Sequence, residues 1–395
     1  MTVRKFVFWL HLAAGLTAGL VIAVMCLTGA ALAFEKQIVG WAERDVRRVE
    51  PPAPGAARLS LDELQIRFRE TAPGKRPAAI TVSTDAHAAV LIAVGRDETY
   101  YANPYTGDIR QPAGNKTRDF MRLMTDLHRT LALPGEGRAA GKAITGACNL
   151  AFLFLAISGM ILWWPRKWRT KGLKRSLWFL RGASGRARDW NWHNVIGFWL
   201  LPVLIVLTAS GAVISYRWAS NLVYRTAGET PPAPGNPGGS AGPASPIAPP
   251  DADARPLGSD ALFAAVLRDF PDAEAVTFRL GDKGSQTGRA TEPPGGKHRS
   301  PRPVNVVVKI PRTWPRTATT TLALDPFTGT VLKREAFADL SAGRRARTWL
   351  RFLHTGEALG GGGQWIAGLA CVGGCFLVYT GMALAWRRFF GEEKK

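Results

Sequence analysis

The sequence predicts a membrane-embedded, all-α four-helix bundle, internally duplicated about a pseudo-twofold axis, with two α+β domains outside the cytoplasm. Three observations lead to this fold class. Four apolar stretches approach or exceed the roughly 20 residues that a helix needs to cross the hydrocarbon core. Several sequence blocks recur in the same order in the two halves of the chain. In each half, a segment with the composition of a soluble domain separates the two apolar stretches.

The predicted membrane spans occupy residues 1–34, 142–166, 190–217 and 364–388. The first resembles a signal peptide, because Arg4 and Lys5 precede its apolar run and small residues stand near its end. That run is much longer than the about 7–15 apolar residues of a signal peptide. We therefore expect it to be a retained membrane helix.

Charge predicts the orientation of the spans. The chain carries a net charge of +21, and its loop 167–189 is rich in Lys and Arg. Short loops with an excess of basic residues remain in the cytoplasm. Both termini then also lie in the cytoplasm, and the two long segments lie outside. This distribution indicates contact with a lipid bilayer, and we expect no nucleic-acid partner.

Each long outer segment reads as a small α+β domain followed by a histidine-bearing helix and loop. An amphipathic helix is expected to open each domain, and a P-x-T-G turn follows the last predicted strand. A Pro- and Gly-rich linker precedes the second domain, and 281–303 is expected to form a mobile hairpin insertion. The domains are 35–115 and 257–340, the histidine helices with their loops are 116–141 and 341–363, the linker is 228–256, and the predicted strands are 79–83, 88–94, 98–102, 275–280, 304–310 and 319–324.

The internal repeat includes both domain and membrane segments. N-P-Y-T-G-D-I at 103–109 is matched by D-P-F-T-G-T-V at 325–331. S-G-M-I-L-W-W-P-R at 158–166 is matched by T-G-M-A-L-A-W-R-R at 380–388, also 222 residues later. Parallel repeats of this kind imply a pseudo-twofold axis along the bilayer normal.

Four of the six histidines occupy matched positions in this repeat. His11 and His193 lie in the first span of each half, and His128 and His354 each precede the second span. A histidine within a membrane is costly unless it has a partner, so by default it marks a functional site. The first two histidines are expected near the inner leaflet, and the other two near the outer leaflet.

Glycines recur at the same two levels. Residues 18 apart lie on one face of a helix, about 27 Å along its axis. This relation links His11 to Gly29 and His193 to Gly211. Small residues let helix backbones approach the face of a flat macrocycle, although ordinary helix packing also uses them. The glycines considered are Gly15, Gly197, Gly29, Gly211, Gly159 and Gly381.

These positions predict two haems inside the bundle, because bundles hold cofactors between facing helices. His11 with His193 would bind the iron of an inner haem, and His128 with His354 that of an outer haem. Two imidazole ligands leave no open position on an iron, so each haem would carry electrons. Arg129 and Arg351 would pair with haem propionates or belong to a solvated face.

Other interpretations of these residues stay open. Each histidine alone could form a structural hydrogen bond, and a zinc or di-metal site is a rival that the lack of carboxylates in the spans weakens. The four cysteines are interpreted as helix-packing residues, and His87 and His298 as solvated. No nucleotide-binding motif is present. The cysteines are Cys26, Cys148, Cys371 and Cys375.

The motifs together resemble the PepSY-associated transmembrane family. They are R-K-x(5)-H-x(3)-G in the first span, D-L-H-R-x-L-x(3)-G-x-G at 126–137, S-G-x-x-L-W-W-P-R, W-H-N-x-x-G-F-W at 192–199 and L-H-T-G-E at 353–357. The resemblance implies PepSY-like outer domains, a bacterial inner-membrane location and two b-type haems. It also implies that His11, His128, His193 and His354 are the ligands. The long linker and the basic insertion depart from the family pattern.

The expected function is therefore that of a haem-dependent membrane oxidoreductase. Electrons from a cytoplasmic or quinone donor would reach the outer haem and reduce a ferric siderophore of the hydroxamate type in the periplasm, which would release iron. Two alternatives remain. PepSY modules could restrain a cell-envelope protease, or the protein could import the iron complex, although polar or broken helices at the midplane are nearly absent.

Overall fold

The computed structural model describes residues 2–95, 98–112, 116–165, 170–233, 246–251, 254–280 and 302–390. The chain divides into two compact units. The membrane unit comprises Met1–Lys36, Arg118–Pro232 and Ala342–Lys395, and the sheet unit comprises Gln37–Thr117 and Ala233–Ser341. Most of the predicted hairpin insertion, His298, part of the predicted linker and the last five residues lie outside the described residues.

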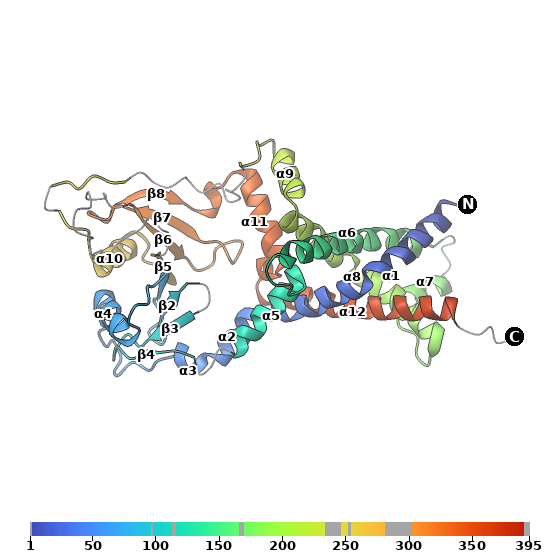
Figure 1. Cartoon of the computed structure of the whole chain (residues 1–395), viewed down its shortest axis with the longest axis horizontal. Coiled ribbons are helices and arrows are strands. Elements are labelled where there is room, and N and C mark those ends of the chain that lie inside the picture. The colour runs from blue at the N-terminus through green and yellow to red at the C-terminus, as the bar shows by residue number, and fades with distance from the viewer. Residues whose placement is uncertain are drawn as a thin grey trace. The chain divides into compact units, whose positions relative to one another are not determined.

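Four long apolar helices form the membrane unit and confirm the four predicted spans. Helix α1 packs against α6 and α12, and helix α8 packs against the same two helices. Helices α1 and α8 therefore face each other across the bundle (Figure 1). Each helix is long and apolar enough to cross a membrane, and their bounds are α1 Val3–Leu32, α6 Gly137–Trp163, α8 Gly185–Ser215 and α12 Gly361–Phe389.

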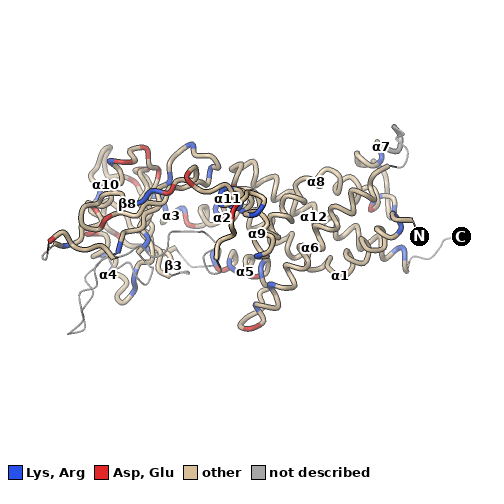
Figure 2. The backbone as a smooth tube through the Cα atoms, turned by 90° about the horizontal axis from the view of Figure 1, so that it is seen from above, with Lys and Arg blue, Asp and Glu red and all other residues tan. Residues whose placement is uncertain are grey.

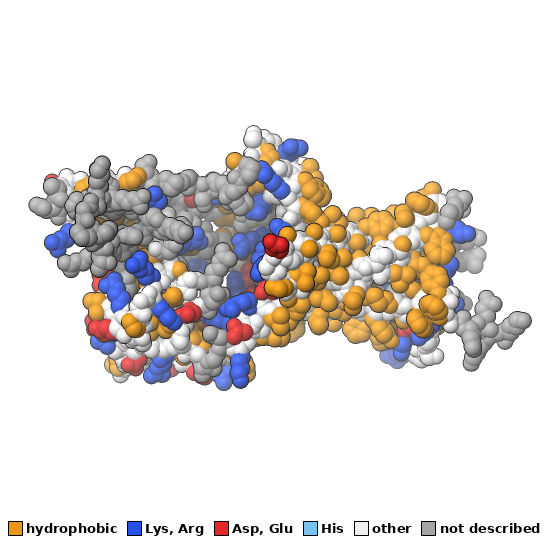
Figure 3. Space-filling view, in the orientation of Figure 1, with side chains coloured by type: hydrophobic (Ala, Val, Ile, Leu, Met, Phe, Trp, Pro, Cys, Tyr) orange, Lys and Arg blue, Asp and Glu red, His pale blue; other side chains and the backbone are white. Residues whose placement is uncertain are grey.

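The surface of this bundle is suited to lipid. Hydrophobic side chains cover the long helices in the space-filling view (Figure 3). Lys and Arg gather at the two ends of the bundle and are nearly absent between them (Figure 2). Part of its interior is also apolar, since Ala18, Ile22 and Cys26 form a buried stripe along α1 at helical spacing. The apolar outer surface of this unit thus suits contact with a lipid bilayer.

Short helices complete the membrane unit. Helix α5, Lys116–Thr130, carries His128 in its last turn, and α11, Ala342–His354, ends at His354. A hydroxyl of α6 ties this helix to α5, because Thr145 donates a hydrogen bond to the backbone oxygen of Arg129 (2.9 Å). The remaining short elements are α7 Thr170–Leu177, α9 Arg217–Thr226 and the 3-10 turn η2 Glu357–Leu359.

The sheet unit contains one antiparallel sheet of eight strands in the order β4-β3-β2-β1-β5-β6-β7-β8. The strands that follow the P-x-T-G turns, β4 and β8, were not predicted. The first is only two residues long, and the second is largely exposed. The bounds are β1 Ala79–Ser83, β2 Val90–Val94, β3 Glu98–Ala102, β4 Ile109–Arg110, β5 Ala275–Arg279, β6 Val304–Lys309, β7 Thr320–Leu324 and β8 Val331–Glu335.

The two halves of this sheet join at its centre. Strands β1 and β5 pair antiparallel with Thr81 opposite Thr277. The hydroxyl oxygens of these two residues are 2.9 Å apart. The sequence predicted two separate outer domains, whereas the structure pairs their first strands in one continuous sheet. An alternating burial pattern in β6 and β7 shows that one face of the sheet lies on a core.

Two helices cover the core of the sheet unit, and each caps the other. They are α4, Leu61–Thr71, and α10, Ser259–Asp269. The carboxylate of Asp260 accepts hydrogen bonds from the backbone N–H groups of Leu61 (2.7 Å) and Asp62 (3.1 Å). Asp62 in turn accepts one from Ser259 N–H (2.9 Å). Carboxylates stabilise helix N-termini, so the two helices are locked together at their first turns.

Three short elements precede or follow the strands. Helix α2 is Glu35–Ala42, helix α3 is Arg44–Arg47, and the 3-10 turn η1 is Phe337–Asp339. Glu43 lies between the two helices and is buried, where it accepts hydrogen bonds from Arg47 (3.0 Å) and from the hydroxyl of Tyr101 (2.7 Å). These bonds tie the start of the sheet unit to strand β3.

Candidate functional site: two histidine pairs in the bundle

The bundle brings the four matched histidines together as two pairs. The ring centroids of His11 and His193 lie 6.5 Å apart, with the ring planes at 79°. Those of His128 and His354 lie 6.3 Å apart, with the planes at 61°. These are the partners that the predicted depths in the membrane suggested. Helices α1 and α8 contribute the first pair, and the ends of α5 and α11 contribute the second.

A hydroxyl group fixes the orientation of each ring in the first pair. Nδ1 of His11 lies 2.8 Å from Ser158 Oγ, and Nδ1 of His193 lies 2.9 Å from Thr380 Oγ1. Both hydroxyls already donate to backbone oxygens in their own helices, Ser158 to Phe154 (2.7 Å) and Thr380 to Phe376 (2.7 Å). They must therefore accept from the imidazoles. Each Nδ1 carries the proton, and each Nε2 keeps a free lone pair.

The second pair is oriented in the same way, with backbone acceptors in addition. Nδ1 of His128 lies 3.0 Å from the backbone oxygen of Met25 and 3.0 Å from Thr28 Oγ1. A carbonyl can only accept, so Nδ1 again carries the proton.

His354 repeats this arrangement on α8. Its Nδ1 lies 2.9 Å from the backbone oxygen of Leu207 and 3.2 Å from Ser210 Oγ. In all four histidines Nε2 is thus free to act as a ligand, and a hydrogen bond on the other ring nitrogen is the usual way to hold a metal-binding imidazole.

Each ring packs against a glycine. In the sequence this glycine directly follows the residue that supplies the hydroxyl. A Cβ atom placed on Gly29 would lie 3.3 Å from Cε1 of His128, and one on Gly211 would lie 3.2 Å from Cε1 of His354. The corresponding distances are 3.6 Å from Gly159 to His11 and 3.4 Å from Gly381 to His193. We call each Ser/Thr-Gly dipeptide and its ring contact a histidine seat. The four seats are Thr28-Gly29, Ser158-Gly159, Ser210-Gly211 and Thr380-Gly381.

The spacing within each pair fits one metal ion between two imidazoles. Metal–nitrogen bonds of about 2.0–2.1 Å, with about 1.1 Å from nitrogen to ring centre, place the centres of two opposed rings roughly 6.3 Å apart. Among the described residues, no group of three or more His, Cys, Asp or Glu side chains could hold a metal ion. An ion with only two protein ligands needs further donors, and the four nitrogens of a haem macrocycle would supply them. The residues therefore fit a bis-histidine haem at each level.

Burial keeps the outer histidines in the form that binds metals. Burial, together with the neighbouring His354, lowers the pKa of His128 to about 4. Burial also lowers the pKa of His354. Both imidazoles are then neutral near pH 7, as a metal ligand must be.

Other residues singled out in the sequence lie around these sites. The nearest side-chain atom to a Cβ on Gly15 or Gly197 belongs to a leucine, at 3.9 Å and 3.6 Å, so neither glycine forms a histidine seat. Arg129 and Arg351 are exposed beside the outer pair. All four cysteines are free thiols within the spans, and Sγ of Cys371 lies 3.1 Å from a Cβ on Gly29. The function of the hydroxyls as hydrogen-bond acceptors was not foreseen.

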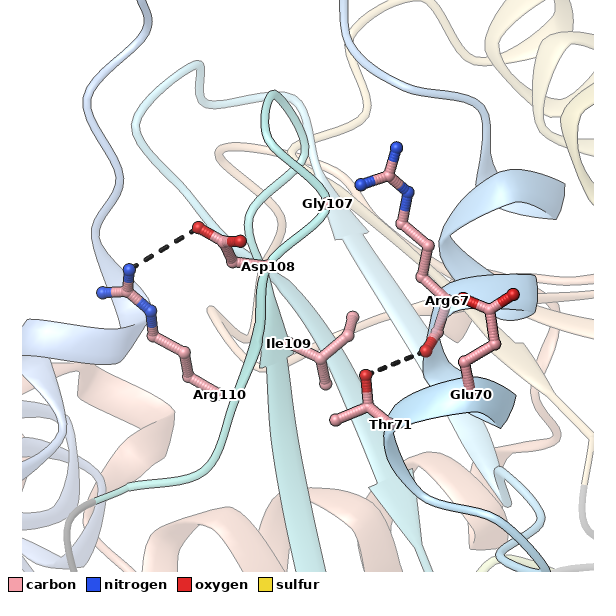
Figure 4. Close-up of a pocket in the computed structure, with 7 residues that line it drawn as sticks. All are labelled: Arg67, Glu70, Thr71, Gly107, Asp108, Ile109 and Arg110. Atoms are coloured by element: carbon pink, nitrogen blue, oxygen red, sulfur yellow. Dashed lines mark hydrogen bonds and ion pairs between the residues drawn. The ribbon is translucent and has the colours of Figure 1, made fainter.

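The sheet unit has a pocket of its own, of about 510 Å³ (Figure 4). Both arginines that line it are already paired. Arg67 binds Glu63 and the backbone oxygen of Thr106, and Arg110 forms an ion pair with Asp108. Among the described residues, the pocket therefore offers a ligand no unpaired arginine. Its lining is Arg67, Glu70, Thr71, Gly107, Asp108, Ile109 and Arg110.

A family model covers nearly the whole chain. The PepSY-associated TM region matches residues 8–388, a range that contains all four histidines and all four seats. No curated protein matches the chain. The chain belongs to the PepSY-associated transmembrane family, as its motifs suggested.

Proposed function

We propose that this member of the family transfers electrons across a membrane through two bis-histidine b-type haems and reduces a ferric siderophore on the outer side. It would be a haem-dependent oxidoreductase of the bacterial inner membrane, with both termini in the cytoplasm and the sheet unit in the periplasm. The observation that carries the proposal is the presence of two histidine pairs, each with the spacing of one metal between two imidazoles.

The two levels lie on the same helices. His11 and the seat at Gly29 are separated by 18 residues of α1, and His193 and Gly211 by 18 residues of α8. A rise of 1.5 Å per residue places the two levels about 27 Å apart along the helix axis. This distance nearly equals the thickness of the hydrocarbon core. One pair would thus lie near each face of the membrane.

The residues of the chain hold and orient the cofactors. A bound haem would supply an iron that cycles between the ferric and ferrous states, one electron at a time. The four Nε2 atoms would ligate, and the histidine seats would keep each ring from turning. Occupation of both axial positions favours electron transfer over binding of oxygen, because no coordination site remains.

The outer partner is a ferric chelate by this proposal, with hydroxamate siderophores as the first class to test. The inner partner is a cytoplasmic or quinone electron donor. Reduction of the chelated iron favours its release, because hard oxygen ligands hold Fe(II) less tightly than Fe(III). The chain itself needs no nucleotide site for this reaction, since the electrons come from the donor.

Visible spectroscopy of the purified protein tests the proposal. We expect the absorbance of b-type haem, two haems per chain, and a shift on reduction with dithionite. His11→Ala and His354→Ala should each remove one haem and leave the other. His87→Ala is the matched control, because His87 is a partly exposed histidine of the sheet unit, outside the bundle. A colourless, metal-free protein from haem-replete cells would refute the proposal.

Reduction of the chelate is a separate measurement. Ferric hydroxamate added to the reduced protein should reoxidise the haems, and an Fe(II) trap should report released iron. Haems that stay reduced with every ferric chelate would leave electron transfer intact and refute the siderophore assignment.

A further inference from the structure

The inner end of the bundle contains a buried carboxylate with two arginines. Asp189 is fully buried in the first turns of α8. Arg188 contacts its Oδ1 through Nε (3.0 Å) and Nη2 (2.9 Å). Nη1 of Arg387, from the end of α12, lies 2.7 Å from Oδ2. The three side chains carry two positive charges and one negative charge, so one positive charge is in excess.

The excess charge belongs to Arg387. Arg188 directs two nitrogen atoms to the carboxylate, and its guanidinium also lies over the ring of Trp192, 5.6 Å from the centroid. Arg387 makes an ion pair without hydrogen-bond geometry. Its Nη1 and Oδ2 of Asp189 are both buried, and neither has a hydrogen-bond partner in the part of the chain that the structure describes. A buried donor on a charged group is costly to leave unsatisfied.

This cluster lies close to the inner histidine pair. Asp189 precedes His193 by four residues, so the two side chains lie on the same face of α8, one turn apart. Arg387 follows Gly381, the glycine of the His193 seat, by six residues on α12. His11 and His193 come from the facing helices α1 and α8. A planar group held between these two histidines would have α6 and α12 at its sides.

Among the described residues of the bundle, the cluster has no counterpart in the first half of the chain. In the alignment of His11 with His193, the position of Asp189 corresponds to Val7. In the alignment of Gly159 with Gly381, the position of Arg387 corresponds to Pro165. Helix packing common to both halves does not need these charges. Their presence in one half indicates a group that is itself asymmetric, with its charge at one edge.

We propose that Arg387, held in place by Asp189, binds a propionate carboxylate of the inner haem. The proposal rests on the proposed function, because it requires a haem between His11 and His193. A carboxylate at Nη1 would balance the excess positive charge and supply the missing hydrogen-bond acceptor. The two arginines are each about a third exposed, at 37% and 34% of their side-chain surface, so this end of the site is open to the aqueous face.

Haem binding to the apoprotein tests the assignment. The full-length chain carrying His354→Ala isolates the inner site, and it is titrated with native haem b or with haem dimethyl ester, which lacks the propionate charges. Arg387→Gln should weaken native haem by about tenfold or more, the effect of one hydrogen bond between charged groups. It should leave the affinity for the ester nearly unchanged. Arg387→Lys should recover part of the loss.

Arg388→Gln is the matched control. Its guanidinium lies over Phe8 and Trp9, 4.9 Å and 5.2 Å from their centroids, so it neighbours Arg387 but interacts with aromatic rings. Equal weakening of haem and ester by Arg387→Gln, or no weakening of either, overturns the assignment. Failure of the unsubstituted protein to bind any haem refutes the proposed function itself. An effect of Arg387→Gln on a bound anionic lipid, with haem affinity unchanged, assigns the charge to a headgroup and also overturns it.

A second readout does not depend on affinity. A positive charge beside the haem stabilises the reduced form, which carries one positive charge less than the oxidised form. Arg387→Gln removes that charge and should therefore lower the midpoint potential of the inner haem. When Arg387→Gln is the only substitution, so that both haems are present, the midpoint potential of the outer haem should stay unchanged. An unchanged inner potential contradicts a contact between Arg387 and the cofactor.

Discussion

The four glycines of the histidine seats should tolerate alanine to different degrees. A methyl group on Gly159 would meet His11 at 3.6 Å, an ordinary van der Waals contact. On Gly381 it would meet His193 at 3.4 Å. On Gly29 it would lie 3.1 Å from Cys371 Sγ and 3.3 Å from His128, so both neighbours would have to move.

Gly211 is the most crowded of the four. A methyl group there would lie 2.9 Å from Asn149 Oδ1 and 3.2 Å from His354 Cε1. Overpacking of this kind costs about 1–3 kcal/mol. Alanine in place of glycine in a helix returns roughly 0.5–1 kcal/mol. The alanine variant of Gly159 should thus be as stable as the unsubstituted protein or more so, whereas Gly211→Ala should be destabilised.

The displaced ring is the one that binds iron, so haem content is the direct assay. Taking the overpacking energy as a loss of binding, the outer site should lose roughly 5- to 150-fold in haem affinity in Gly211→Ala. The loss of haem affinity should be smaller in Gly29→Ala and smaller again in Gly381→Ala, which affects the inner site. Gly159→Ala should keep nearly the haem affinity of the unsubstituted protein. Haem titration of the four variants, with thermal unfolding as the control for folding, gives this order. Equal haem loss in Gly159→Ala and Gly211→Ala would contradict the geometry of the seats.

Two further predictions concern single hydrogen bonds. Ser158→Ala leaves the buried Nδ1–H of His11 without its acceptor, and a loss of about 1–3 kcal/mol should appear as weaker haem binding at the inner site in a haem titration. Thr17→Ala is its control, because the Thr17 hydroxyl donates only to backbone oxygens of its own helix; similar haem loss in both variants would exclude a specific effect of the seat. Asp260→Ala removes two N-terminal hydrogen bonds of α4, whereas Asp62→Ala removes one of α10. Each should cost about 1 kcal/mol, with the larger loss for Asp260→Ala, and hydrogen exchange at the first turn of the uncapped helix should detect it. Unchanged exchange in both variants would argue against the reciprocal caps.

The spans and the histidine partners could be predicted because their signals are local. Each span is a long apolar run, and His11 and His193 each have a fixed distance to a glycine in the same helix. Pairing by depth then needed only the positive-inside rule. The ring of His11 lies next to that of His193, and the ring of His128 next to that of His354, as pairing by depth predicted.

The joined sheet could not be predicted in the same way. Strands β1 and β5 pair residues almost 200 positions apart, such as Thr81 with Thr277. The pattern of a half-buried strand is the same whether its free edge meets solvent or another strand. The two-residue strand β4 has too few positions to show any alternation. Such features depend on which surfaces meet, and a single sequence does not specify that.

The histidine seats lay between these cases. A Ser or Thr directly precedes a glycine at the corresponding position of all four spans, and this recurrence can be read from the sequence. The four glycines are Gly29, Gly159, Gly211 and Gly381. The sequence relates the glycine to the face of a macrocycle and gives no role to the hydroxyl. The structure shows that the glycine contacts the imidazole and that the hydroxyl accepts a hydrogen bond from its Nδ1–H.

The seats also explain why two halves are needed for one site. His11 sits on Ser158 and His128 on Thr28, all within the first half of the chain. The second half repeats this with His193 and His354. Each half therefore orients one ligand at each level by itself, and a metal with two axial ligands requires both halves. Loss of one histidine should leave the opposite ring oriented and its Nε2 available, so added imidazole should restore haem binding to His11→Gly. A failure of imidazole to do so, in a variant that folds, would mean that the second ring depends on the first for its orientation.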